Sequence, residues 1–406
     1  MKKYIAHIYI FLMVVYYGQG YLSLSEGIIG KLLLVLIVLF SLYYWIYAIA
    51  KFKLPIPLNV LNIMLVIWTF YGIYPIMVGS SAIKSVDQPT YYYLKNIYIS
   101  ILPIYSFYVF TKKKMLTEYS VKIWYFAFLL VAIMGYIYNQ QMILQALSEG
   151  GRDVSEITNN AGYTMATLLC LLPLFNKKPL VQYSLMAICL YFVLVGFKRG
   201  AIICAALCAI MIIIHSFKMS GGRRKKTVST KWKIIVITIV LLAASVYAIN
   251  MLIETSDYFN YRLESTLEGR SSERDNIYSF FYEHFTTESN PIIFLFGNGA
   301  YGTIELYRKF AHNDWLEIAI DNGLVFLLIY AIYWVSILSV LSRGEKKSPY
   351  TLMLATFVII YLFRTFVSMS YSAITPYAAL AFGMSLANFQ CKKNYKRIIN
   401  NNNYTV

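Results

Sequence analysis

The sequence predicts an all-α, polytopic integral membrane protein of about twelve transmembrane helices. Of its 406 residues, 59% are hydrophobic and 14% are charged, whereas a soluble domain carries about 25% charged residues. Apolar runs such as 31–50 and 233–253 are long enough for membrane helices, since about 20 residues cross the ~30 Å hydrocarbon core. The composition therefore excludes an ordinary soluble globular protein.

Polar or basic connections divide the apolar runs into spans. In chain order, the spans are expected at 4–22, 28–50, 57–78, 93–111, 120–139, 161–175, 180–196, 200–217, 234–253, 315–341, 350–368 and 371–389. Basic clusters recur at every second connection, as the positive-inside rule requires. This pattern places both termini in the cytoplasm, including the polar tail 390–406. The basic residues behind the net charge of +17 are then explained by membrane topology and by some contact with anionic lipid. No nucleic-acid partner is expected.

The remaining connections face outward, and the longest of them is the large outer loop 254–312 of a single polytopic domain, 1–406. Within this loop, SSERDNIYSFFYEHF (271–285) places Ile277, Phe281 and Phe285 on one stripe, which predicts an amphipathic helix. The five cysteines imply no disulfide framework, because none lies in a large outer loop.

A titratable cluster follows this loop in AHNDWLEIAIDNG (311–323), at the outer mouth of a span. Asn313 or Asp314 can cap the helix. Glu317 and Asp321 lie deeper, where carboxylates are costly unless they face a water-filled cavity or a partner. His312 is the candidate catalytic residue, because a neutral imidazole with a pKa near ~6.5 suits a general base. Asn313 and Glu317 are candidates for contacts with substrate.

Arginine and lysine side chains supply candidate anion-binding groups on the same outer side. Lys198 and Arg199, in VGFKRGAII (195–203), break the charge rule of the other connections. Arg364 lies within a span, so it is either functional or paired with a buried carboxylate such as Glu317 or Asp321.

The large loop contributes three further arginines, Arg270, Arg274 and Arg308. Guanidinium groups that converge at the outer interface would hold a lipid diphosphate, because the planar fork donates paired hydrogen bonds and stays charged. The run FLFGNGAYG (294–302) adds a glycine-rich turn. Nucleotide-loop, metalloprotease and zinc motifs are absent from the sequence, so no metal and no cofactor is expected.

Three segments resemble the O-antigen polymerase and ligase superfamily of bacterial inner membranes. They are RSSERDNIY (270–278), FLFGNG (294–299) and AHNDWLEIAIDNGLVF (311–326). KRGAI (198–202) is similar to the arginine-glycine signature of that superfamily. The histidine motif of its ligases continues from His312-Asn313 through Gly323 but ends in Gly, Thr or Tyr, where this chain has Phe326.

The resemblance implies a metal-independent glycosyltransferase of GT-C-like architecture, with its active site on the periplasmic side. The donor and acceptor would be oligosaccharides on undecaprenyl diphosphate, and a chain-length regulator protein would be a partner. Arg199 and either Arg274 or Arg270 would bind diphosphate, and His312 would activate the acceptor hydroxyl. Lys198, Arg308 and Arg364 are candidates on charge and position alone.

Three functions fit these features. A polymerase of the Wzy type would transfer a growing chain to the next lipid-linked repeat unit. A ligase would use the same chemistry to move glycan to lipid A–core or to protein. A flippase or transporter would also suit twelve spans, but transporters usually show repeated halves and polar groups at the midplane, and this chain shows no internal repeat.

Overall fold

The computed structural model describes most of the chain. The described residues are 2–22, 27–78, 86, 88–148, 161–196, 198–220, 236, 247, 250, 251, 254, 264 and 274–402. Every regular element among them is a helix, which confirms the all-α prediction for this part of the chain. The predicted span 234–253 falls almost wholly outside the described residues.

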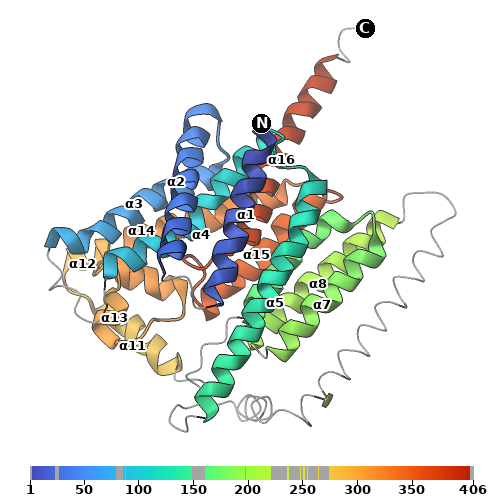
Figure 1. Ribbon diagram of the computed structural model, residues 1–406. Coiled ribbons are helices and arrows are strands. Elements are labelled where there is room, and N and C mark those ends of the chain that lie inside the picture. Colours follow the sequence, from blue (N-terminus) through green and yellow to red (C-terminus); the bar gives the residue numbers. More distant parts are fainter. Residues whose placement is uncertain are drawn as a thin grey trace.

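Figure 1 shows the arrangement of the described helices. In chain order they are α1 (Lys2–Gly20), α2 (Ile28–Lys51), α3 (Ile56–Val78), α4 (Pro89–Lys112), α5 (Glu118–Ser148), α6 (Ala161–Leu168), the 3-10 helix η3 (Leu169–Phe175), α7 (Pro179–Val195), α8 (Arg199–Ser220), α11 (Arg274–Thr287), α12 (Pro291–Phe296), α13 (Gly302–Tyr307), α14 (Asp314–Ser342), α15 (Pro349–Val367) and α16 (Pro376–Asn402).

Six helices in the described part of the chain are long and apolar enough to cross a membrane. They are Ile28–Lys51, Ile56–Tyr74, Glu118–Met142, Arg199–Phe217, Asp314–Ser342 and Pro349–Val367. Two shorter apolar segments, Ala161–Phe175 and Pro179–Val195, also match predicted spans. These long apolar helices are those expected of a membrane protein, while the count of twelve spans stays a prediction.

Helices α8 and α15 pack against each other in opposite directions, and this pairing positions the candidate site. The Cys204 thiol lies 3.9 Å from the carbonyl oxygen of Ile359, and the Cys208 thiol lies 3.7 Å from that of Thr356. Cysteine here packs as a small apolar residue with a weak S–H donor. Because the register is antiparallel, the first turn of α8 lies beside the last turn of α15.

The glycine after Arg199 permits this close approach. A Cβ atom on Gly200 would lie 3.2 Å from the Phe363 ring of α15 and would clash with the Tyr163 hydroxyl of α6. Arg199 therefore begins α8 at the junction of α6, α8 and α15.

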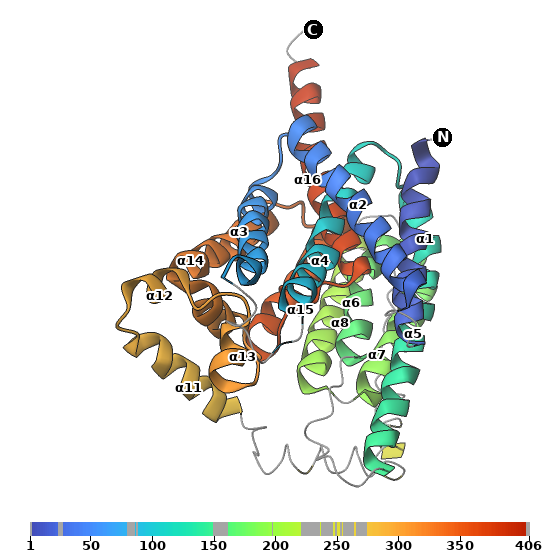
Figure 2. The same ribbon diagram turned by 60° about the vertical axis from the view of Figure 1, so that its left-hand side comes forward.

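The short helices α11, α12 and α13 gather against the first half of α14, on the far side of α15 from α5 and α7 (Figure 2). Ile277 and Phe281 of α11 are buried together with Ala311 and with Ile320 of α14, and Phe285 packs at the edge of this cluster. The predicted amphipathic helix thus exists, begins at Arg274, and fastens its apolar stripe to α14.

Candidate active site

A tight turn presents His312 immediately before α14. The Asn313 side-chain oxygen caps the helix by accepting hydrogen bonds from the backbone N–H groups of Trp315 (2.9 Å) and Leu316 (3.2 Å). Ala311 and Asp314, on either side of the turn, are buried, whereas His312 keeps much of its surface exposed although neighbouring groups cover part of it. His312 has φ 53°, a left-handed conformation that costs a residue other than glycine about 1–2 kcal/mol. The surrounding contacts therefore hold the backbone of this turn in a conformation that it would not adopt alone.

Asp314 fastens this turn to the segment after α15. Its carboxylate is fully buried and accepts hydrogen bonds from the Ser370 backbone N–H (2.8 Å), the Tyr330 hydroxyl (2.8 Å) and the Ser370 hydroxyl. Sequence analysis gave Asp314 only a capping role, which the structure gives to Asn313. The role of Asp314 in fastening the loop after α15 depends on Ser370, which is distant in sequence.

The buried carboxylates of Glu317 and Asp321 accept hydrogen bonds from the segment between α12 and α14. Glu317 accepts hydrogen bonds from the Thr303 hydroxyl (2.8 Å) and the Ala311 backbone N–H (2.7 Å), one on each carboxylate oxygen. Asp321 accepts one from the Thr303 backbone N–H (2.9 Å). Glu317 is fully buried, so the prediction that it contacts substrate is corrected: it positions the loop that carries His312.

The glycine-rich run docks on a break in α14. Gly297 and Gly323 both adopt positive φ, 76° and 74°, and a Cβ atom on Gly323 would lie 2.5 Å from the Gly297 nitrogen. The backbone N–H groups of Asn298 and Gly299 donate to the carbonyls of Ile320 (2.8 Å) and Asp321 (2.9 Å). Only glycine permits both the dihedrals and the approach. The glycine-rich turn expected from the sequence is therefore anchored to α14.

Helix α11 brings Arg274 to the end of α15 and to the His312 turn. The Arg274 guanidinium donates to the carbonyl of Val367 at 3.0 Å. One turn later, the Tyr278 hydroxyl lies 3.2 Å from the carbonyl oxygen of His312 and 3.3 Å from that of Phe366. The predicted catalytic pair, His312 and Arg274, is thus assembled on one framework.

Cations from three segments surround the imidazole. Partial burial, followed by the charges of Arg274, Lys198 and Lys309, lowers the pKa of His312 from 6.5 to about 4. The imidazole is therefore neutral at neutral pH and can accept a proton. Sequence analysis missed Lys309. Lys309 lies three residues before His312, in a loop with several other cations, and nothing in the sequence distinguished it from them.

Arg199 lies at the same end of the molecule as Arg274. Its neighbour Gly200 faces the Tyr163 hydroxyl, and that hydroxyl lies within electrostatic range of both Arg274 and Arg364. We call Lys198, Arg274 and Lys309 the cation cluster, because all three charges act on His312. Lys198 and Arg274 were predicted from the sequence, and Arg199 follows Lys198 directly at the start of α8.

Arg364 is held by backbone carbonyls and aromatic rings, and its charge also acts on the buried Asp314 carboxylate. Its guanidinium donates to the carbonyls of Met369 (2.9 Å) and Ala373 (3.4 Å). It also lies over the rings of Tyr163 (4.8 Å) and Tyr361 (5.3 Å). Glu317 and Asp321 have their own partners, described above, so the pairing considered from the sequence does not account for Arg364. The Arg364 side chain is buried and stabilises the loop after α15 through these hydrogen bonds.

Arg308 and Arg270 were also predicted from the sequence as anion-binding arginines. Arg308 follows the last residue of α13, with an exposed side chain and φ 57°. The charge of the adjacent Lys309, rather than that of Arg308, lowers the pKa of His312. Arg270 lies outside the described residues, so Arg274 is the loop arginine that the structure places at the site.

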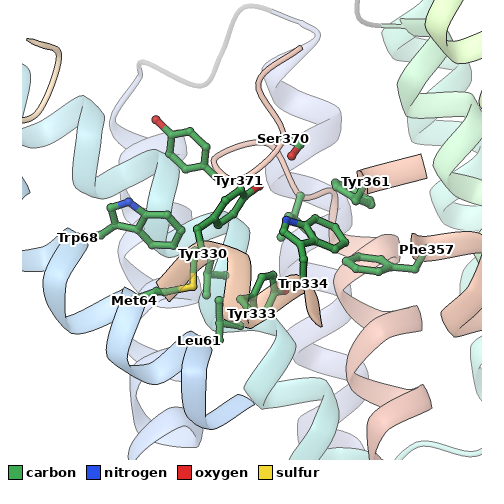
Figure 3. Close-up of a pocket in the computed structure, with 12 residues that line it drawn as sticks. Leu61, Met64, Trp68, Tyr330, Tyr333, Trp334, Phe357, Tyr361, Ser370 and Tyr371 are labelled. Carbon is green, nitrogen blue, oxygen red and sulfur yellow. The ribbon is translucent and has the colours of Figure 1, made fainter. Parts of the chain in front are cut away.

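Two hollows adjoin these residues. A surface groove of about 450 Å³ opens beside the His312 turn, and we call it the aromatic groove. It is lined by Tyr278, Ser279, Tyr282, Asn313, Trp315, Leu316 and Phe366. The other hollow, inside the bundle, is lined mainly by aromatic residues, with Ser370 at its wall (Figure 3). At about 20 Å³ the inner hollow has room for about one water molecule, so of these two hollows only the groove could receive a substrate.

Chemically, the site combines a neutral proton acceptor with several cations and an adjoining groove. Such a site can bind an anion and remove a proton from a hydroxyl group beside it. No group of histidine, cysteine, aspartate and glutamate in the described part of the chain is arranged to hold a metal ion. No protein-family model matches the chain, and no curated protein matches it significantly.

Proposed function

We propose that the protein is a polysaccharide polymerase of the Wzy type, acting on lipid-linked repeat units at the periplasmic face of a bacterial inner membrane. The resemblance of the histidine, arginine and glycine segments to the O-antigen superfamily gives the reaction class. Both termini would be cytoplasmic, and the twelve spans would form a GT-C-like architecture with the large loop outside. A chain-length regulator protein would be its partner.

The reaction joins one sugar to another and releases a lipid diphosphate. A hydroxyl oxygen of the acceptor repeat unit bonds to the anomeric carbon of the growing chain, while the bond from that carbon to the diphosphate breaks. The hydroxyl proton passes to His312. Undecaprenyl diphosphate leaves with both phosphate charges held by Arg199, Arg274 and Lys198, which stabilise the charge that develops in the transition state.

One observation carries the proposal: Arg274 and Lys198 come from distant parts of the chain and both act on the imidazole of His312. Cations gathered beside a neutral base can donate charge-assisted hydrogen bonds to an anion. A diphosphate would supply such an anion. It would also raise the pKa of His312 from about 4 toward the ordinary value, where the imidazole is a more effective base.

Site variants in the native host would test the proposal. His312→Ala and Arg274→Ala should each abolish the ladder of polymerised glycan, while membrane levels of the protein stay normal. His284→Ala in the last turn of α11 and Arg343→Ala at the opposite end of α14 are matched controls, and both should leave the ladder intact. Ladders of normal length and amount from both site variants would refute the assignment.

The acceptor separates polymerase from ligase. Purified protein given only lipid-linked repeat units should lengthen them if it is a polymerase. Transfer only to added lipid A–core or to protein would instead identify a ligase with the same site.

A further inference from the structure

The aromatic groove has a composition unlike the cation cluster next to it. Its lining comes from α11, from the start of α14 and from the end of α15, and includes no charged side chain. Tyr282 and Phe366 are 64% and 51% exposed. The Trp315 indole donates to the Thr365 hydroxyl at 2.9 Å and stacks on Phe366, with ring centroids 5.8 Å apart. The groove is therefore a fixed aromatic platform.

We propose that the aromatic groove binds the sugar residues of the acceptor repeat unit. This inference rests on the proposed glycosyl transfer and names the acceptor side of that same site.

The order of residues along α11 distinguishes the acceptor side from the donor side. Arg274, Tyr278 and Tyr282 are spaced four residues apart, so they share one face of the helix. Arg274 belongs to the cation cluster, Tyr278 contacts the His312 carbonyl, and Tyr282 lines the groove. The face thus runs from the cations, past the base, to the groove.

Displacement at an anomeric carbon requires the same order. The leaving diphosphate must lie beside the cations, and the attacking hydroxyl must lie within hydrogen-bond reach of the base. The remainder of the acceptor must then extend away from the cations. The groove occupies that position, because Asn313 and Tyr278 form its wall next to His312.

The lining also favours a sugar over a lipid chain. A sugar ring offers an apolar C–H face to an aromatic ring and hydroxyl groups at its edges. The groove supplies aromatic faces from Tyr282 and Trp315, and polar groups from Ser279 and the Asn313 amide. Binding sites typically combine apolar walls with a few polar groups that fix orientation in this way. Without a formal charge, the groove is unsuited to the diphosphate itself.

Binding of a free oligosaccharide tests the assignment without requiring turnover. Cells carrying His312→Ala should accumulate unpolymerised lipid-linked repeat unit, and mild acid would release its oligosaccharide as the probe. Saturation-transfer NMR would measure its affinity for the purified, full-length protein. Tyr282→Ala should weaken binding about tenfold, which corresponds to 1.4 kcal/mol. Tyr282→Phe should keep most of the affinity, and Tyr119→Ala, at a 75% exposed tyrosine at the start of α5, should keep all of it.

Binding of undecaprenyl diphosphate provides the second measurement. Tyr282→Ala should leave it unchanged, and Arg274→Ala should weaken it. Equal oligosaccharide affinity in the native protein and Tyr282→Ala would overturn the groove assignment while leaving the proposed transfer standing. Loss of both ligands in Tyr282→Ala would overturn it too, since the groove would then not be separate from the cation cluster. Absence of accumulated repeat unit in His312→Ala cells would reject the proposed function, and the groove assignment with it.

Discussion

The Tyr278 hydroxyl lies 3.2 Å from the backbone carbonyl oxygen of His312. The two residues belong to different segments, and the contact fixes the turn that aims the imidazole. Because Arg274 is one helical turn away on the same face of α11, one helix sets the position of both the base and the nearest arginine.

Replacing Tyr278 by phenylalanine should separate positioning from binding. The ring that lines the groove remains, but the hydroxyl contact to His312 is lost. We expect kcat to fall about tenfold while KM for the donor stays within about twofold, as for an interaction that acts in the transition state. The thermal unfolding midpoint should hardly change, since one exposed hydrogen bond contributes about 1 kcal/mol. A rise in donor KM with unchanged kcat would show that Tyr278 serves binding instead.

The pH dependence should reveal the cations around His312. In the free enzyme the pKa of His312 is lowered to about 4, so kcat/KM should lose activity only as the pH falls through that value. Bound diphosphate offsets the charges of Arg274 and Lys198, which raises the pKa. The acid limb of kcat, which reports the enzyme–substrate complex, should therefore lie at higher pH than the limb of kcat/KM. Coincident limbs near the ordinary value of 6.5 would contradict the cluster.

Asp314 should matter for stability more than for chemistry. Asp314→Ala leaves the Ser370 N–H and the Tyr330 hydroxyl without their acceptor in a buried site, and each unpaired donor costs about 1–3 kcal/mol. We expect a clearly lower unfolding midpoint in detergent, followed by tryptophan fluorescence. Asp275→Ala, which removes an exposed carboxylate on α11, is the matched control and should unfold like the native protein. An unchanged midpoint for Asp314→Ala would show that other contacts hold the loop after α15.

Sequence patterns predicted many of the helices, but not the contacts that build the candidate site. Hydropathy located α2, α5, α8, α14 and α15, because a span needs a continuous apolar run that is visible in the chain. The stripe Ile277–Phe281–Phe285 likewise predicted α11.

The partners of the buried polar groups were not visible in the same way. Glu317 was expected beside substrate and is instead paired with Thr303, and Arg364 is held by carbonyls of the loop that follows it. Such pairings depend on how distant segments pack, and the type of residue does not reveal them. Lys309 was missed for the same reason, since its charge matters only because the turn brings it near His312.

The paired glycines give the last prediction, which concerns the link between the break in α14 and the active site. In Gly323→Ala, the new Cβ would lie 2.5 Å from the Gly297 nitrogen and the Leu295 carbonyl oxygen, at φ 74°. The left-handed conformation alone costs about 1–2 kcal/mol, and the close contact should push α12 and the glycine run off α14. We expect a lower unfolding midpoint together with loss of transfer, because the displaced segment leads directly to His312. Gly20→Ala is the control: it has open space around the new methyl group and lies in α1, where alanine favours the helix by about 0.5–1 kcal/mol. That variant should be at least as stable as the native protein and fully active. If Gly323→Ala behaved like Gly20→Ala, the break in α14 would not be what positions the histidine.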